Sequence, residues 1–248
     1  FIREKSTEVK PSHVKKIKKI KEGMFKDFNY DDFKEEQPPK NKSLQTYNEL
    51  KHLQTLEEDK DFVKEMDVIE DVFESVCEKH SIEFPKEMVD KILSDSGGII
   101  LDLKYYHNRP RPSILAKEYN MKLAEVMLPS MKTPSYPSGH STQGYLVGLY
   151  LADKFDNVKL STEFMKAAKD ISDSRNIARA HYISDSKFGE KLGKKLYEYI
   201  KSDIKIKENL LETIIEGFVR ESPASDQAKQ MGLVSKGWGR WADSKTGK

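Results

Sequence analysis

The stretch SRNIARAHYISD, from Ser174 to Asp185, indicates more about the fold than any other part of this chain. His181 and Asp185 are four residues apart, so in a helix their side chains share one face. Arg175 adds a permanent cation to the same segment. Alone, the histidine and the aspartate would be an ordinary exposed pair on a helix. Their meaning therefore depends on what the rest of the chain supplies.

Two strings earlier in the chain complete a pattern. They are Lys104 with Arg111-Pro112, and Pro137-Ser138-Gly139-His140. A phosphate monoester carries about two negative charges, which repel a nucleophile. Fixed cations and neutral donors are therefore the first requirement for attacking it. Arginine can present a planar fork to two oxygens, and a serine and a glycine amide at a helix start can bind the same anion. The strings together predict a pocket that holds a tetrahedral oxyanion without a metal.

The three strings resemble the signature of the superfamily that joins type 2 phosphatidic acid phosphatases, class A bacterial acid phosphatases and vanadium haloperoxidases. That signature is K-x6-RP, then PSGH, then SR-x5-H-x3-D, and every fixed position is present here in order and at the required spacing. The resemblance covers about residues 100–195. Ser135-Tyr136 and the region of Gly144 look most like the soluble class A acid phosphatases.

The resemblance implies a role for each fixed position. His181 is the nucleophile that forms a phosphohistidine, and Asp185 orients it by accepting a hydrogen bond from one ring nitrogen. His140 is the general acid and base, which protonates the leaving group and later takes a proton from water. The remaining positions bind the phosphate: Lys104, Arg111, Ser138, Gly139 and Arg175. No metal and no cofactor is implied, and vanadate would bind as a mimic of phosphate.

The expected function is that of a soluble, metal-independent phosphatase, a phosphoric monoester hydrolase that acts on small phosphorylated substrates. Three alternatives remain open. One is a vanadium-dependent haloperoxidase, in which the same histidine coordinates vanadium. Another is a lipid phosphatase that acts from the membrane surface, and the third is a protein that only binds phosphate. We interpret His107, Arg109 and Arg179, which occupy unfixed positions inside the motifs, as residues without a catalytic part.

The expected fold class is all-α, with a single helical-bundle domain of the acid phosphatase and haloperoxidase type. We expect a basic N-terminal arm at 1–41, a helical phosphatase domain at 42–220 and a polar C-terminal tail at 221–248 that carries Trp238 and Trp241. No segment shows the alternation of a strand.

Apolar periodicity sets the expected helices. One apolar stripe runs from 59 to 80, and a helix that opens at Pro85 continues toward Lys104. Residues 113–138, which contain three prolines, are expected to be irregular. The remaining helices are expected at about 139–155, 161–183, 185–201 and 204–219.

Composition limits the partners. Lys and Arg number 43 against 41 Asp and Glu, a net charge of +2, which gives no global attraction to nucleic acid. The longest apolar runs are too short for a transmembrane segment. A lone cysteine, Cys77, cannot form an internal disulfide. We expect a cytoplasmic protein, or a periplasmic or secreted one if a leader was removed, and a homo-oligomer stays open.

Overall fold

The computed structural model describes residues 9–221, 233–235 and 241–243 of the chain. It contains two compact units, and the boundary between them falls between Tyr199 and Ile200. The boundaries predicted from composition, after residue 41 and after residue 220, stay a prediction. The following paragraphs concern mainly the first unit, which carries all the motif residues.

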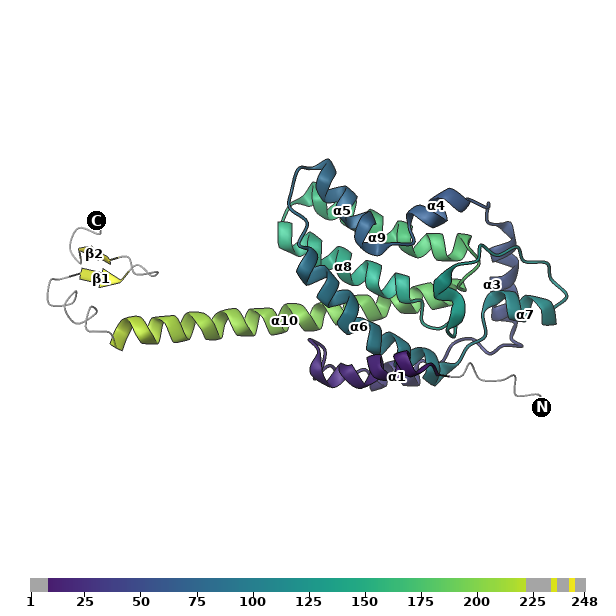
Figure 1. The fold of residues 1–248 in the computed structure, drawn as a ribbon, viewed down its shortest axis with the longest axis horizontal. Helices are drawn as coiled ribbons and strands as arrows, with labels where there is room; N and C mark the ends of the chain where they lie inside the picture. The colour runs from purple at the N-terminus through teal and green to yellow at the C-terminus, as the bar shows by residue number, and fades with distance from the viewer. Residues whose placement is uncertain (1–8, 222–232, 236–240, 244–248) are drawn as a thin grey trace. The chain divides into compact units, whose positions relative to one another are not determined.

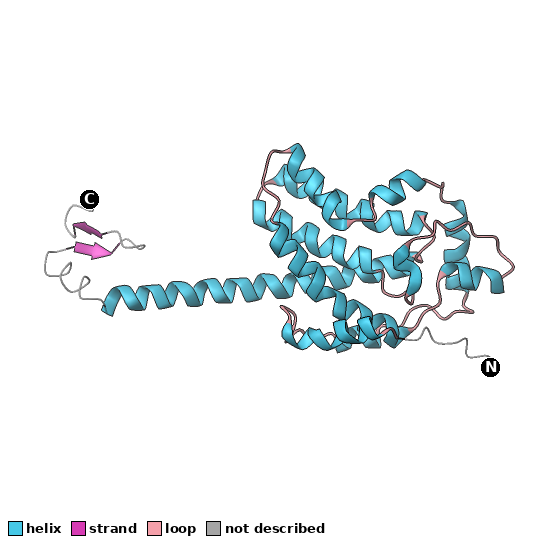
Figure 2. Ribbon diagram, viewed as in Figure 1, coloured by secondary structure: helices cyan, strands magenta, loops and turns pink. Residues whose placement is uncertain are grey.

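The described residues of the first unit form helices joined by loops (Figures 1 and 2). The α-helices are α1 (Pro11–Lys18), α2 (Asp31–Glu35), α3 (Leu44–Thr55), α4 (Lys60–Glu65), α5 (Ile69–Lys79), α6 (Lys86–His107), α7 (Pro112–Glu118), α8 (Gly139–Phe155), α9 (Val158–Ile177) and α10 (Ile183–Glu221). Two short 3-10 turns, η1 (Lys19–Glu22) and η2 (Pro129–Lys132), interrupt the loops. The predicted all-α fold class is confirmed.

The second unit contains a pair of short strands, β1 (Leu233–Ser235) and β2 (Trp241–Asp243). They are antiparallel, and Val234 lies opposite Ala242. The sequence did not indicate these strands because three residues are too few to show alternation. Trp241 lies in β2, whereas Trp238 lies outside the described residues.

Helix α8 lies at the centre of the first unit. It packs against α9 along its length, and it also contacts α5 and α6 (Figure 1). The fully buried side chains come from these helices and from the first turns of α10, and they include Phe73, Ile92, Ile99, Leu103, Leu146, Val147, Phe164, Ile171, Leu192 and Leu196. Burying such side chains is the main stabilising contribution to a helical domain.

Two glycines let α10 approach α8 closely. A Cβ atom at Gly193 would lie 2.3 Å from the Thr142 carbonyl oxygen, and one at Gly189 would lie 2.6 Å from the Ser138 carbonyl oxygen. Both distances are far below van der Waals contact, so no other residue fits without moving a backbone. The spacing between these two helices is therefore set by residues without side chains.

Several elements differ from the sequence prediction. The apolar stripe at 59–80 is divided into α4 and α5, and Asp67, which lies between them, accepts a hydrogen bond from Arg175. Helix α7 covers the first residues of the segment expected to be irregular, and it begins at Pro112, a first-turn position where a proline is favourable. Helix α10 runs without a break through 201–204, since no proline or glycine interrupts that stretch.

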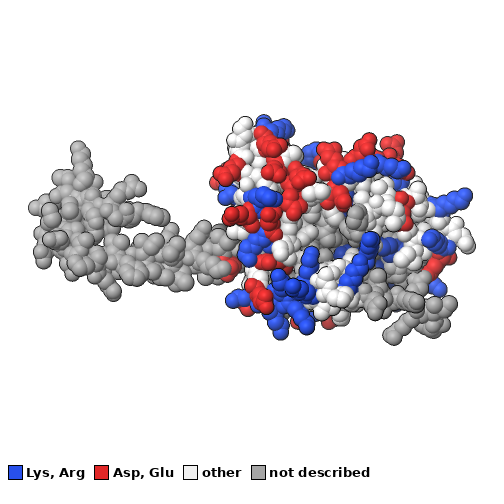
Figure 3. Space-filling model, viewed as in Figure 1, with Lys and Arg blue, Asp and Glu red and all other residues white. Residues whose placement is uncertain are grey.

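The N-terminal residues pack on the helical core. Helices α1 and η1 lie against α6, where the Nδ1 atom of His13 lies 2.7 Å from the Tyr105 hydroxyl. Acidic and basic side chains both occupy the face of the molecule shown in Figure 3. Among the described residues, no helix is long and apolar enough to cross a membrane.

Candidate active site

The motif residues lie at six places along the chain. Lys104 lies in the last turn of α6, and Arg111 immediately precedes α7. Ser138 is the residue that caps the N-terminus of α8. Arg175 lies in the last turn of α9, His181 in the turn that follows, and Asp185 in the first turn of α10.

Local backbone features explain why these ends meet. Helix α6 ends because Asn108 adopts a left-handed conformation, with φ 45°, and prolines follow at 110 and 112. Helix α9 ends in the same way at Arg179, with φ 56°. The Arg179 guanidinium holds that turn by donating to the carbonyls of Ile177 and Leu56, at 2.5 and 2.6 Å. The chain then reverses into α10 and presents His181.

The His181 ring lies between a carboxylate and a guanidinium. Its Nδ1 atom lies 3.2 Å from Asp185 Oδ2, and its Nε2 atom lies 3.1 Å from Arg111 Nη1. An ionised carboxylate can only accept and a guanidinium can only donate. These two neighbours therefore require the tautomer with the proton on Nδ1 and the lone pair on Nε2.

Asp185 is fully buried and is held by several donors. Its Oδ1 atom accepts from Arg109 Nη1 at 2.6 Å, and its Oδ2 atom accepts from the Tyr182 amide at 3.0 Å and from the Ser135 hydroxyl. Burial would raise the pKa of Asp185, but the charge of Arg109 and the hydrogen bonds from His181 and Ser135 hold it below its ordinary value. Asp185 is thus ionised at neutral pH.

Arg111 lies on the Nε2 side of the His181 ring, and Lys104 is close enough for its charge to act on that ring. Lys104 Nζ donates to the carbonyls of Pro134 and Ser135, at 2.9 and 3.3 Å. Arg111 donates to the carbonyls of Thr133 and Ala180, at 2.8 and 2.7 Å. Carbonyl oxygens compensate a buried positive charge less well than an anion does.

The pKa values of Lys104 and Arg111 reflect this incomplete compensation of their buried charges. Burial lowers the pKa of Lys104 well below its ordinary value, and the nearby charge of Arg111 lowers it further. Burial also lowers the pKa of Arg111 to about 10. Both residues are therefore cations that an arriving anion would stabilise.

The third cation is paired with a carboxylate that the sequence did not indicate. Arg175 Nη1 donates to Asp67 Oδ1 at 2.5 Å, and Arg175 Nη2 donates to the Val63 carbonyl at 3.0 Å. His140 Nε2 lies 3.0 Å from the Asp67 carbonyl and 3.4 Å from Asp67 Oδ1. Because both partners are acceptors, the proton of His140 lies on Nε2. Burial lowers the pKa of His140, and the hydrogen bond to Asp67 opposes that effect.

Ser138 and Gly139 begin α8 beside this cluster. The Ser138 hydroxyl oxygen accepts from the Ser141 amide at 3.3 Å and from the Ser141 hydroxyl at 2.8 Å. The Ser138 amide donates to the Asp185 backbone carbonyl at 3.1 Å. A Cβ atom at Gly139 would lie 3.5 Å from Ile100, which is an ordinary contact, so no atom within the protein requires a glycine there.

Contacts join the predicted residues in two groups. His181 contacts Asp185 and Arg111, and Lys104 and Ser138 bind the loop and the helix that hold Asp185. Arg175 and His140 both contact Asp67. Arg175 and His181 are only 1% and 4% exposed, whereas the side chains of His140 and Asp67 are 17% and 27% exposed. The roles assigned to these residues stay a prediction.

Sequence reasoning missed four residues of this cluster, namely Glu49, Asp67, Arg109 and Ser135. Arg109, interpreted above as a residue without a catalytic part, is buried and binds Asp185 directly. Glu49 had a signal in the sequence, because it shares a helix face with Thr46, Leu50 and Leu53, which are all buried. A carboxylate on a buried face requires a charged partner.

Comparison with known proteins gives one informative likeness. No protein-family model matches the chain, and no curated protein matches it. Among solved structures, the crystal structure of a bacterial vanadium-dependent iodoperoxidase is similar, with a TM-score of 0.52 and 18% sequence identity. The match covers 67% of this chain and 51% of that chain, so the chain spans about half the length of this neighbour. The first unit therefore has an all-α fold of the haloperoxidase type. The nearer likeness to class A acid phosphatases stays a prediction.

Proposed function

We propose that this chain, on a fold of haloperoxidase type, is a metal-independent phosphatase that hydrolyses phosphomonoesters through a phosphohistidine at His181. The observation that carries the proposal is the tautomer of His181. Asp185 and Arg111 together leave the lone pair on Nε2, among the cations that would hold a phosphate. A neutral imidazole with a fixed lone pair is a competent nucleophile at phosphorus.

Electrostatics supports an anionic ligand. Burial lowers the pKa of Lys104, of Arg111 and of Arg175, so each cation is less stable here than in water. A phosphate dianion placed among them would recover much of that loss, and its binding would raise all three pKa values. Preorganised charge of this kind also stabilises the extra negative charge of the transition state.

The reaction would proceed in two balanced steps. Nε2 of His181 attacks phosphorus, a phosphorus–nitrogen bond forms, and the phosphorus–oxygen bond to the leaving group breaks. His140 in its doubly protonated form, with Nε2–H toward Asp67, gives the proton of its other ring nitrogen to the departing oxygen and becomes neutral. Water then attacks the phosphohistidine, His140 takes its proton, and inorganic phosphate leaves with His181 regenerated.

A second candidate function has one observation in its favour. The structural neighbour is described as a vanadium-dependent iodoperoxidase. Vanadate is also a tetrahedral oxyanion, and the same lone pair on His181 with the cations Lys104, Arg111 and Arg175 fits it. When bound in haloperoxidases, vanadate activates peroxide for halide oxidation. The residues of this chain would then bind and orient the oxyanion without forming a phosphohistidine.

One experiment separates the two candidates. The purified protein is incubated with a panel of phosphomonoesters and EDTA, and in parallel with vanadate, hydrogen peroxide and iodide or bromide. The phosphatase proposal expects phosphate release and an acid-labile phosphohistidine, seen by phosphorus NMR or by mass spectrometry at His181. Halide oxidation without phosphate release would instead select the peroxidase.

A variant tests the nucleophile itself. His181→Ala is expected to lower kcat by at least about 10⁴-fold, the scale on which loss of a nucleophile acts, while vanadate still binds in calorimetry. The matched control is His52→Ala, an exposed histidine on α3. Undiminished turnover by His181→Ala would rule out the assigned nucleophile.

A further inference from the structure

We infer that Glu49 of α3 is a positioning residue for His181, acting through Arg109 and Asp185. The inference rests on the proposed role of His181 as nucleophile. It concerns a residue more than a hundred positions away in the chain and outside all three motifs. The hydrogen bonds that join these four side chains carry the argument.

The first link is a guanidinium shared by two carboxylates. Arg109 Nη1 donates to Asp185 Oδ1 at 2.6 Å, and Arg109 Nη2 donates to Glu49 Oε2 at 3.0 Å. The Arg109 side chain is fully buried and lies over the Tyr182 ring, with 3.8 Å between the guanidinium carbon and the ring centre. A buried guanidinium cannot turn to water, so its position follows its two carboxylates.

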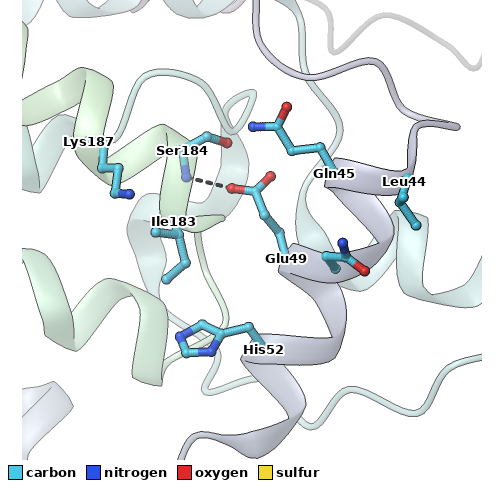
Figure 4. Close-up of a pocket in the computed structure, with 8 residues that line it drawn as sticks. Leu44, Gln45, Glu49, His52, Ile183, Ser184 and Lys187 are labelled. Carbon is cyan, nitrogen blue, oxygen red and sulfur yellow. Dashed lines mark hydrogen bonds between the residues drawn. The ribbon is translucent and has the colours of Figure 1, made fainter.

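The second link is to the backbone of α10. The other oxygen of Glu49, Oε1, accepts from the Ser184 amide at 2.6 Å, and Figure 4 shows this bond across the gap between α3 and α10. Ser184 also receives a hydrogen bond from Arg109 Nη1 at 2.7 Å through its hydroxyl. Glu49 therefore holds the first turn of α10 through Ser184. It also holds Arg109, the cation that binds Asp185, the residue after Ser184.

The carboxylate of Glu49 changes the net charge of the group that it forms with Arg109 and Asp185. Arg109 and Asp185 alone would form a neutral pair, in which the guanidinium draws electron density from the oxygens that face His181. With Glu49 the group carries a net negative charge. Burial would lower the pKa of Arg109, but the charges of Asp185 and Glu49 raise it. The carboxylate of Asp185 thus keeps more of its charge for the Nδ1 proton of His181.

Glu49 is also the member of this chain of bonds that solvent reaches. It lines a pocket of about 570 Å³ with Leu44, Gln45, Asn48, His52, Ile183, Ser184 and Lys187 (Figure 4). Its side chain is 11% exposed, whereas those of Arg109 and Asp185 are 0% exposed. Residue 49 can therefore be changed without opening the core around His181.

The test is Glu49→Gln, which keeps the shape but places an amide group where Arg109 needs an acceptor. An outer partner that orients a histidine is typically worth about 10- to 100-fold, so we expect kcat to fall about 10-fold with KM nearly unchanged. Removing a nearby negative charge also disfavours the imidazolium, so the acidic limb of the kcat/KM profile should move to lower pH. His181 also faces Lys104 and Arg111, which this variant leaves in place.

A readout independent of turnover separates this inference from the proposed function. The Nδ1 proton of His181, observed by NMR without substrate, should shift upfield and exchange faster with water in Glu49→Gln. Asn48→Ala, in the same pocket, and Glu57→Gln, an exposed carboxylate beyond the end of α3, are the controls and should behave as the unchanged protein. If the unchanged protein hydrolyses no phosphomonoester, the proposed function fails while the NMR comparison still tests Glu49.

A folding defect has its own remedy. If Glu49→Gln does not fold, Glu49→Asp keeps the charge but shortens the side chain that reaches Arg109, so it should fold with the His181 signal altered. If the pH profile and the NMR signal are unaltered in whichever variant folds, the inference is overturned, and Glu49 has only a structural role.

Discussion

Arg109 and Arg111 are two residues apart, equally buried, and opposite in their surroundings. Arg109 is 2% exposed and lies between the carboxylates of Asp185 and Glu49, whose charges raise its pKa against the effect of burial. Arg111 is 6% exposed and donates to the carbonyls of Thr133 and Ala180, and burial lowers its pKa to about 10. Arg109 lies between two carboxylates of the protein, whereas for Arg111 the effect of burial outweighs the nearby charges, that of Asp185 included, so an added anion would raise its pKa.

The contrast extends to the two sides of the His181 ring. On the Nδ1 side, Asp185, Arg109 and Glu49 form a closed set of charged hydrogen bonds. On the Nε2 side, buried cations meet mainly carbonyl oxygens. This teaches that burial of an arginine does not indicate its purpose; the charge of its partners does.

The largest expected effect comes from the closed side. Asp185→Asn presents a donor where Nδ1 of His181 and Arg109 both need an acceptor, so it would favour the wrong tautomer. By analogy with other orienting carboxylates, kcat should fall about 10⁴-fold, measured with a phosphomonoester that the unchanged protein hydrolyses. Asp173→Asn on the exposed face of α9 is the control, and an equal loss there would discredit the comparison.

The next effect concerns stability. Arg109→Gln leaves two buried carboxylates without their common cation, so the free energy of unfolding should fall by about 3–5 kcal/mol. Denaturant unfolding measures it. Arg111→Gln, two residues on, should lose clearly less, because burial already disfavours the charge of that guanidinium. Similar losses in both variants would show that the two arginines are equivalent.

The effects of the two substitutions on catalysis should rank in the opposite order, with the larger loss in Arg111→Gln. Arg111→Gln removes a donor from the proposed phosphate site, so kcat/KM should fall about 10²- to 10³-fold, the usual effect of losing one preorganised donor. Phosphate affinity by calorimetry should fall in parallel. A variant that hydrolyses substrate normally would mean that the anion binds elsewhere.

The smallest effect is a pH dependence of stability. The pKa of Lys104 is lowered in the folded protein, so between that pKa and its ordinary value of 10.5 the unfolded chain binds a proton that the folded chain has released. Stability gained from this residue therefore rises with pH across that window, by at most about 1.4 kcal/mol per pH unit. The unfolding free energy of the unchanged protein should therefore rise with pH across that window relative to that of Lys104→Met. Parallel curves would show that Lys104 is not destabilised by burial.

The sequence predicted the fold class because helix signals act over short distances. Ser138 caps α8 where the turn residues indicated, and the helix that carries Lys104 starts after Pro85. The same local reasoning missed the break between α4 and α5, because the apolar stripe continues through it. Asp67 lies in that break and binds Arg175, 108 residues away in the chain.

Residues at fixed spacing could be assigned to the site in advance, whereas their partners could not. The motif relates positions that were known to belong together, such as His181 and Asp185. Glu49 and Arg109 are 60 residues apart, and no spacing rule joins them. Their meeting depends on how α3 packs beside α10, which is decided by tertiary contacts and not by local propensity.

The glycines at 189 and 193 have a consequence for evolution and design. Because a single methyl group on either would collide with the backbone of α8, these two glycines fix the distance between the start of α8 and the first turns of α10. Neighbouring loops can be exchanged to alter which molecules enter, but neither glycine tolerates an added side-chain atom. Amino-acid substitutions in this protein should therefore accumulate around the contact between α8 and α10 and leave the two glycines unchanged.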